Sequence, residues 1–491
     1  MKASFNKILL LVVAVASASC NESFLDRNHP GDLTGDKLYK TVEDFEGALA
    51  GCYGSILGPA TTNIYLGEIP SDNVYISRFQ PSGNWVDMDR LAITAQNGSL
   101  NGYWTDNFAT VQRVNIFLDE LERSGMTETD KNVMAAEARF LRAYAYFNLV
   151  RVFGAVPVYD KRMPLQEMYD VPRGSLDAIY QLIIDDLTEA ANLDDYRTPD
   201  AQAMAGGKAS TTAALAMLGK VYLWKKDFPK AEQTLRTVVE ESGKGLVDLA
   251  DLYDADEPFN QEIIFSINYA RTSGFNHPLT AASVPYNVDP TDIYPNISGS
   301  FGSGMFMIEP YVAAKFEAND KRLTDWTRTV TFEVLGTEDT NIFSLKYVDP
   351  LTTFNGLSGA NTIILRYADV LLMYAEALNE NGKTGDAYPH IDAVRLRAGI
   401  NELPDGYSKQ QMFEALADER QREFLLEGDR WFDLRFRGMD FLEDEMEVFK
   451  PNAYLEQNRE VVVEDHLILF PLPEEQVLIK PILGQNDGYG S

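Results

Sequence analysis

The sequence predicts a mainly α-helical fold: a scaffold of tetratricopeptide-like helical hairpins with inserted irregular loops and short β-strands. Two stretches share a spacing of large and small residues that is typical of paired antiparallel helices. The intervening segments, 58–106 and 244–360, are rich in Gly, Pro, Asn, Ser and aromatic residues and show no sustained period. Apolar residues recur at helical spacing over 107–124, 131–153, 175–193, 211–243, 365–400 and 410–437.

The chain begins with a segment typical of protein export. Two lysines precede the apolar run 8–16, which is too short to cross a bilayer because a span needs about 20 residues. The small residues that follow lead to Cys20 and resemble a bacterial lipobox, although Ser17 replaces the usual larger aliphatic residue. We expect a lipoprotein signal peptide over 1–19, a lipid on Cys20 and an anchoring tether over 20–40. An ordinary signal peptide cut nearby is the alternative.

The composition limits which functions and folds the rest of the chain can have. The 491 residues carry 43 Lys+Arg against 74 Asp+Glu, a formal net charge of −31, which argues against binding nucleic acid. We expect residues 41–491 to form one domain. Of the two cysteines, Cys52 lies in an apolar series of helical spacing and is expected to be a small core residue rather than a nucleophile.

The elements are expected in the following order. Thr41 and Asp44 form a capping-box pattern that begins a helix over about 41–57. The pair over 211–243 places Gly219 and Ala231 twelve positions apart, and Ala375 and Ala387 repeat that interval. A looser third copy joins the helix at Ala145 to a helix carrying Ala178 and Leu182. Residues 263–267 predict a short strand.

No distinctive catalytic or metal-binding pattern is present. The four histidines are scattered without ligand spacing, and no HExxH, GxSxG or phosphate-binding glycine loop occurs. Pairs of acids are abundant in so acidic a chain, so they single out no glycosidase site. We therefore expect no catalytic residue, no metal and no cofactor.

Aromatic residues beside polar ones are more informative. Sugar rings stack their apolar faces on aromatic side chains, while their hydroxyls bind carboxylates, amides and guanidinium groups. Two loop-like regions and a nearby tryptophan offer both kinds of group, since long irregular segments on a rigid scaffold usually carry function. The candidate ligand-binding residues are Asp72, Asn73, Tyr75, Arg78, Asn84, Trp85, Tyr286, Tyr294 and Trp326.

Three C-terminal segments bring a family resemblance. Residues 364–377, 419–435 and 469–475, the last followed by 486–489, resemble the SusD/RagB family of outer-membrane nutrient-binding lipoproteins of Bacteroidetes. The resemblance implies a SusD-like fold and a non-catalytic, cell-surface protein that captures oligosaccharides or polysaccharides and delivers them to a SusC-like TonB-dependent transporter. Peptide cargo, as in the RagB branch, is one alternative, and an exported glycosidase is another.

The segment 419–435 also has a purely structural interpretation. Glu419, Glu423 and Glu427 recur every four residues, so they share one helix face. We expect Arg430 and Arg435 to return to these glutamates. We expect Gly428 to end the helix and Asp429 to cap the next one. Such pairs would orient the last helices rather than bind sugar.

Overall fold

The computed structural model describes residues 39–77, 83–193, 207–272, 274, 276–286, 288, 289, 291, 293, 302–334, 337–351, 357–452 and 463–490. The chain divides into two compact units, residues 1–47 and residues 48–491. The expected signal peptide, Cys20, nearly all of the expected tether, Arg78 and Tyr294 lie outside the described residues.

Within the first unit, the predicted capping box is confirmed at the start of helix α3 (Val42–Ser55). The Asp44 backbone N–H donates to Thr41 Oγ1 at 3.3 Å, and the Asp44 carboxylate accepts from the Thr41 backbone N–H at 2.9 Å. These reciprocal bonds satisfy donors that the first helical turn leaves without a partner. They also lower the pKa of the Asp44 carboxyl.

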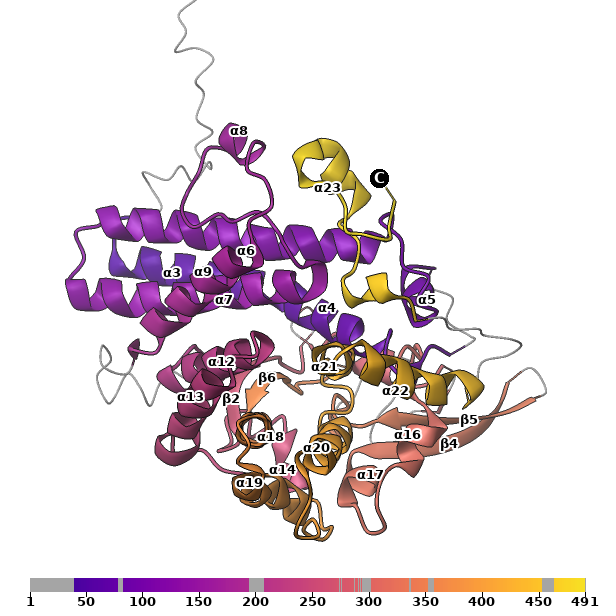
Figure 1. Cartoon of the computed structure of the whole chain (residues 1–491). Coiled ribbons are helices and arrows are strands. Elements are labelled where there is room, and N and C mark those ends of the chain that lie inside the picture. The colour runs from indigo at the N-terminus through magenta and orange to yellow at the C-terminus, as the bar shows by residue number, and fades with distance from the viewer. Residues whose placement is uncertain are drawn as a thin grey trace, which may run out of the picture. The chain divides into compact units, whose positions relative to one another are not determined.

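The second unit is mainly helical, which confirms the predicted fold class (Figure 1). Its longer helices are α4 (Leu57–Glu68), α6 (Gly98–Arg123), α7 (Glu128–Phe153), α9 (Leu176–Ala190), α12 (Thr211–Trp224), α13 (Phe228–Glu241), α18 (Tyr367–Glu380), α19 (Thr384–Arg397), α20 (Lys409–Glu423), α21 (Arg430–Arg437) and α22 (Met439–Asn452). Short helices complete it: α5 (Gly83–Asp89), α8 (Leu165–Met168), α14 (Leu249–Leu252), α15 (Thr280–Ser283), α16 (Pro310–Ala314), α17 (Lys321–Asp325), α23 (Glu474–Ile479), η3 (Asp465–Ile468) and η4 (Pro481–Leu483). None of the described helices is long and apolar enough to span a bilayer.

Two of the predicted hairpins are confirmed. Helices α12 and α13 pack together, and a Cβ at Gly219 would lie only 2.4 Å from Leu235 Cδ2, so the first helix needs a glycine there. Helices α18 and α19 pack in the same manner, with Ala375 and Ala387 fully buried. Small residues at these positions let the two helix axes approach closely.

The third hairpin exists with a different buried face. Helices α7 and α9 pack against each other, as predicted. However, Ala178 is exposed and Leu182 is only half-buried, whereas Ile179 and Ile183 are fully buried. The predicted register was therefore one residue off, because α9 has apolar residues on adjacent rows and spacing alone does not decide which row faces inward.

Two small antiparallel sheets complete the unit. One has the strand order β1 (Val74–Tyr75), β3 (Met307–Ile308), β5 (Thr337–Ser344) and β4 (Thr327–Val334). The other pairs β2 (Ile263–Ile267), which confirms the predicted strand, with β6 (Thr362–Arg366). Val74 pairs with Ile308, and Met307 pairs with Phe343, so this sheet joins the two regions that the sequence predicts to be irregular.

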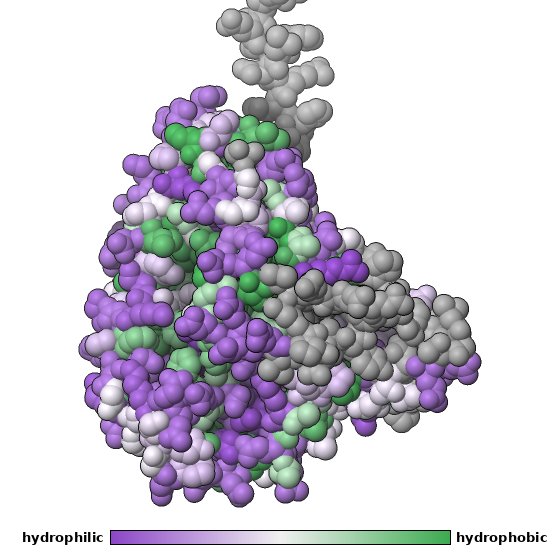
Figure 2. Space-filling view, turned by 45° about the vertical axis from the view of Figure 1, so that its right-hand side comes forward, coloured by the Kyte–Doolittle hydropathy of each residue, from purple (hydrophilic) through white to green (hydrophobic). Residues whose placement is uncertain are grey.

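The region 58–106 is less irregular than predicted. It contains α4, α5 and the start of α6. Helix α4 escaped prediction because Gly58, Pro59 and Gly67 obscure its period, yet a proline is tolerated in the first turn of a helix. Cys52 is fully buried and free, as predicted for a core residue, and burial raises the pKa of its thiol to about 12. On the face shown in Figure 2, hydrophobic residues form small patches among hydrophilic ones.

Candidate functional site

The segment between α4 and β1 is held in the interior by charged and amide side chains. Asp72 is fully buried and accepts two bonds from Arg430, at 2.6 and 2.7 Å, and one from the Tyr311 hydroxyl at 2.8 Å. Burial raises the pKa of the Asp72 carboxyl, but Arg430, Lys315 and Tyr311 together lower it by more, so the pKa lies below its usual value. Asn73 is equally buried and donates to Glu68 at 2.9 Å.

These contacts correct the interpretation of Asp72 and Asn73 as groups that face a ligand. Their polar atoms are occupied by protein partners and have no access to solvent. The sequence placed them in a polar, loop-like stretch, where acids and amides are usually solvated. Their partners Arg430 and Gln421 lie about 350 positions away along the chain, so local sequence did not reveal them.

Tyr75 and Trp326 are also core residues. Tyr75 is 3% exposed and packs with Val284, Met307 and Phe343. Trp326 is 5% exposed, and its indole N–H donates to the Leu249 carbonyl at 3.1 Å. Trp326 is also one of the residues that line a pocket of about 310 Å³. The Lys346 ammonium lies 4.3 Å from the centre of its ring and covers one of its faces.

Trp85, in contrast, lies at the surface on α5, where it is half-buried. Its ring stacks on Tyr65 of α4, with centroids 4.6 Å apart and planes at 26°. Tyr65 in turn contacts the buried Phe306 at 4.8 Å. One side of the Trp85 ring is thus supported by a second and a third ring, which fixes its orientation. Burial raises the pKa of the Tyr65 hydroxyl to about 12, so it stays neutral.

Asn84 precedes Trp85 and is exposed. Its backbone carbonyl accepts a bond of 2.9 Å from the side-chain amide of Asn97. Asn97 also caps α6, because its side-chain oxygen accepts from the backbone N–H groups of Ser99 and Leu100. One asparagine therefore ties α5 to the start of a long, rigid helix, and this tie places Asn84 and Trp85.

Tyr286 lies at the surface in the second irregular segment. It is 37% exposed. Its backbone N lies 3.5 Å from where a Cβ on Gly304 would be, and the Gly304 carbonyl accepts from the Ser77 backbone N–H at 2.8 Å. Gly304 has a φ of +65°, a conformation that favours glycine. Phe306 lies two residues after Gly304 and contacts Tyr65, whose ring stacks on Trp85.

The structure therefore leaves Asn84, Trp85 and Tyr286 at the surface, the first two adjacent on α5, and buries Asp72, Asn73, Tyr75 and Trp326. Tyr65 and Phe306, which support the Trp85 ring, were not predicted from the sequence. Tyr65 carried no local signal because its helix was not predicted, and Phe306 sits in a glycine-rich stretch. The described residues contain no cluster of three or more His, Cys, Asp or Glu side chains placed to hold a metal ion.

A buried junction anchors this region from below. The Glu68 carboxylate accepts from the Gly428 backbone N–H at 2.7 Å, and burial raises the pKa of Glu68 to about 8. A Cβ on Gly67 would lie 1.8 Å from the Gly428 carbonyl oxygen. The end of α4 and the turn before α21 therefore meet backbone to backbone.

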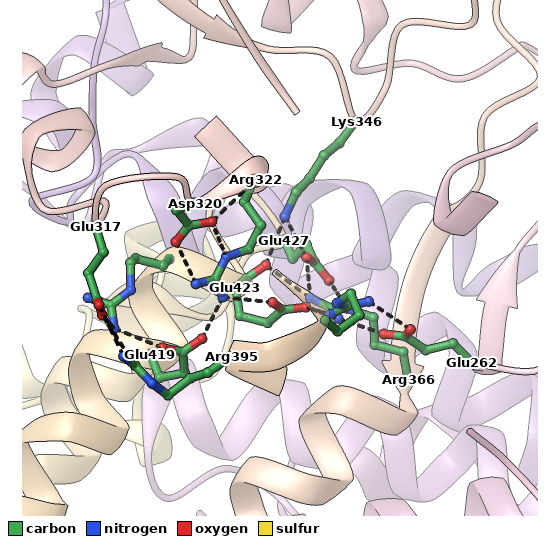
Figure 3. Close-up of polar contacts among 12 residues, drawn as sticks. Glu262, Glu317, Asp320, Arg322, Lys346, Arg366, Arg395, Glu419, Glu423 and Glu427 are labelled. Carbon is green, nitrogen blue, oxygen red and sulfur yellow. Dashed lines mark hydrogen bonds and ion pairs between the residues drawn. The ribbon is translucent and has the colours of Figure 1, made fainter. Parts of the chain in front are cut away.

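That turn follows a network of buried ion pairs around the end of α20 (Figure 3). Glu419, Glu423 and Glu427 are among its acids, as their spacing suggested. Burial raises the pKa of the Glu423 carboxyl, but Arg397, Arg366 and Arg322 lower it by more, so it lies far below its usual value. The cations that pair with the three glutamates are Arg322, Lys346, Arg366, Arg395, Arg397 and Arg422.

The predicted partners within the segment were wrong. Arg430 pairs with Asp72 and Glu445 instead of the glutamates. Arg435 leaves Nε and Nη1 buried without a partner among the described residues, and burial lowers its pKa to about 9. Asp429 occupies the N-cap position of α21, but it makes no capping bond and accepts from Lys220 at 2.6 Å instead. Helix α20 ends at Glu423, before Gly428.

In chemical terms, the surface offers the supported ring of Trp85 beside the exposed amide of Asn84 and, from the second irregular segment, the exposed side chain of Tyr286. Such a surface suits a ligand with alternating apolar faces and hydroxyl edges. Beneath it, the ion pairs fix the backbone and are not themselves accessible.

Comparison with known proteins agrees with this fold. Residues 314–489 match the SusD family, and residues 23–223 match a family described as "Starch-binding associating with outer membrane". A SusD-like protein, P2, of Formosa agariphila is 25% identical over 528 aligned positions, which cover 98% of this chain and 99% of that protein.

Further similar proteins are also SusD-like. The starch-binding protein SusD of Bacteroides thetaiotaomicron is 23% identical over 451 positions, 77% of this chain and 76% of its own length. The solved structure of a laminarin-binding SusD-like protein superposes with a TM-score of 0.78 at 24% identity, over 92% of this chain and all of the other. That likeness establishes the shared fold. With both parts of the chain matched and the fold in common, the chain belongs to the SusD-like proteins.

Proposed function

We propose that the protein is a lipid-anchored, cell-surface protein of the outer membrane that binds oligosaccharides or polysaccharides. It delivers them to a SusC-like TonB-dependent transporter and does not cleave them. Two kinds of match support the proposal: the family description names starch binding and the outer membrane, and relatives of the same fold are named for binding starch and laminarin.

The observation that carries the proposal is the supported ring of Trp85. A sugar binds an aromatic side chain best when the ring is held flat and one face is open, because immobilising a free side chain costs entropy. The stack with Tyr65 and Phe306 holds the Trp85 ring in one orientation before any ligand arrives. Asn84 supplies a hydrogen-bonding group beside the ring, and we place Arg78, Tyr286 and Tyr294 in the same binding surface from their positions in the sequence.

The test is a binding assay with Trp85→Ala. Covering roughly 80 Å² of apolar ring at about 25 cal/mol per Å² contributes about 2 kcal/mol. We therefore expect affinity for the cognate glycan to fall roughly thirtyfold by isothermal titration calorimetry against a panel of α- and β-glucan oligosaccharides. Phe259→Ala, which removes an aromatic ring that is 53% exposed elsewhere, is the control and should leave affinity unchanged.

Tyr286→Ala tests the second side of the surface. Tyr169 is a matched control because it is 40% exposed, close to the 37% of Tyr286. Loss of affinity in Tyr286→Ala with no loss in Tyr169→Ala would support the proposed surface. Binding of peptides with none to any glycan would instead establish peptide cargo, and release of shorter sugars from a polysaccharide would establish a glycosidase.

A further inference from the structure

A second pocket lies away from the Trp85 surface. It has a volume of about 240 Å³ and is lined by α6, by residues 157–169 including α8, and by the C-terminal elements α23 and η4. Most of its lining is apolar, with Phe108, Leu165, Met168 and Ile479 among the side chains that form it. No residue of α5, β1 or β3 contributes to it, so it is independent of the proposed glycan surface.

The aromatic wall of this pocket is rigid. Trp104 is 5% exposed, and its ring lies 4.8 Å from Phe108. Phe108 meets Tyr159 edge to face at 5.6 Å. Because each ring is held by the next, the pocket keeps its shape without a ligand. An apolar cavity of roughly 150 Å³ is enough to hold a benzene ring, so this pocket accepts a ring-sized group.

One cation lies in this otherwise apolar wall. Lys480 is 8% exposed, and its ammonium donates to the Tyr159 hydroxyl at 3.0 Å and to the Met168 carbonyl at 2.6 Å. Both partners are uncharged, and no described carboxylate forms a salt bridge with it. An ammonium has three N–H donors, so one remains for a further acceptor. Burial lowers the pKa of Lys480 to about 8, an effect that the nearby Asp170 carboxylate offsets only in part.

The rim of the pocket is also apolar. Leu165 is 68% exposed, Tyr169 40% and Ile479 53%. Apolar groups that converge on a pocket with one buried, incompletely satisfied charge are typical of a ligand site.

We propose that this pocket binds a compact apolar carboxylate. The hydrocarbon body packs against Trp104, Phe108 and Met168, and the carboxylate accepts the remaining N–H of Lys480. A charge-assisted bond of this kind is roughly twice as strong as a neutral one, so the acid is preferred to its uncharged analogue. The inference does not depend on glycan binding.

The test compares 3-phenylpropionate with 3-phenylpropanamide on the full-length mature protein by isothermal titration calorimetry. We expect the acid to bind at least tenfold more tightly than the amide. Lys480→Met, which keeps the apolar stem, should abolish that preference, and Lys383→Met, at an exposed lysine, should not change it. A peptide ending in phenylalanine, compared with its C-terminal amide, shows whether the source of the carboxylate is a free acid or a chain terminus.

Ile479→Ala keeps the inference falsifiable if Lys480→Met does not fold, because Ile479 is exposed and its loss does not threaten the core. We expect this variant to weaken binding of 3-phenylpropionate about threefold, without altering the preference for acid over amide. The proposal is overturned if the acid shows no saturable binding at millimolar concentration, if acid and amide bind equally, or if Ile479→Ala binds the acid as tightly as the wild type.

Discussion

Gly67 and Gly428 show how much can depend on one missing side chain. A methyl group on Gly67 would lie 1.8 Å from a backbone carbonyl oxygen that has no freedom to move aside. The two glycines join the end of α4 to the turn before α21, and the segment 68–77 that leads to β1 begins at this contact. Helix α4, which carries Tyr65 against Trp85, therefore meets the turn before α21 without any side chain between them.

Gly67→Ala should destabilise the fold severely. Forcing a methyl group into a packed interior costs about 1–3 kcal/mol, and more where the obstacle is backbone. Gly102→Ala is the matched control, since Gly102 is also helical and a Cβ there meets nothing within 4 Å. That variant should be more stable by roughly 0.5–1 kcal/mol, because alanine favours the helix. Urea unfolding of both variants measures the difference, and equal midpoints would refute the contact.

Glu68, the next residue, predicts a pH dependence. Burial raises its pKa to about 8, well above the value near 4.3 of an unfolded glutamate. The neutral form is favoured in the folded state, so this group's contribution is fully present below the unfolded pKa and is lost as pH rises through about 8. Glu68→Gln stays neutral at every pH. Between pH 5 and pH 8, its urea midpoint should therefore fall less than that of the wild type. If the two midpoints fell by the same amount, Glu68 would be charged in the folded protein.

At the scale of elements, the ion-pair network fixes the orientation of α20. Arg322 is fully buried and donates to Asp320, Glu419 and Glu423 at 2.6 to 2.9 Å. Buried pairs give little net stability compared with apolar packing, but removing one partner leaves the others uncompensated. The network therefore specifies how the helix packs.

Arg322→Met should cost roughly 3–5 kcal/mol, the range for breaking a buried pair. Arg123→Met is the control, because Arg123 is 63% exposed and pairs with Asp119 at the surface. Arg123→Met should lower the free energy of unfolding by no more than about 1 kcal/mol, and this loss should disappear when salt is added. Chemical denaturation at low and high salt tests both variants, and a salt-sensitive loss in Arg322→Met would mean that the network is solvated.

The network also shows what the sequence could and could not predict. The spacing of Glu419, Glu423 and Glu427 correctly indicated a structural role. Arg322, the shared partner of Glu419 and Glu423, lies about 100 positions upstream, and the spacing of residues along a helix does not identify a distant partner. The same limit explains the two tryptophans. Both Trp85 and Trp326 have polar neighbours in sequence, but Leu249 and Tyr253 cover Trp326, whereas α5 leaves Trp85 at the surface.

At the scale of the whole molecule, the proposed function requires attachment as well as binding. The sequence offers Cys20 for a lipid, and a lipoprotein anchor carries two or three acyl chains, which hold a protein at a membrane where one chain would be marginal. Binding and attachment then belong to different parts of the chain, because the proposed ligand residues all lie beyond Asp72. The two properties should be separable by mutation.

A protein that starts at Asn21 should bind glycan with unchanged affinity but fail to support uptake. Without acyl chains it has no stable hold on the membrane, so its concentration beside the transporter falls even though the Trp85 surface is intact. Calorimetry on the purified protein measures the first property, and uptake of labelled glycan by cells producing only this form measures the second. Trp85→Ala with Cys20 retained is the reciprocal control, since it should stay in the membrane fraction and bind weakly. Full uptake by the unanchored form would show that the lipid is dispensable, whereas loss of glycan affinity in that form would show that residues before Asn21 take part in binding.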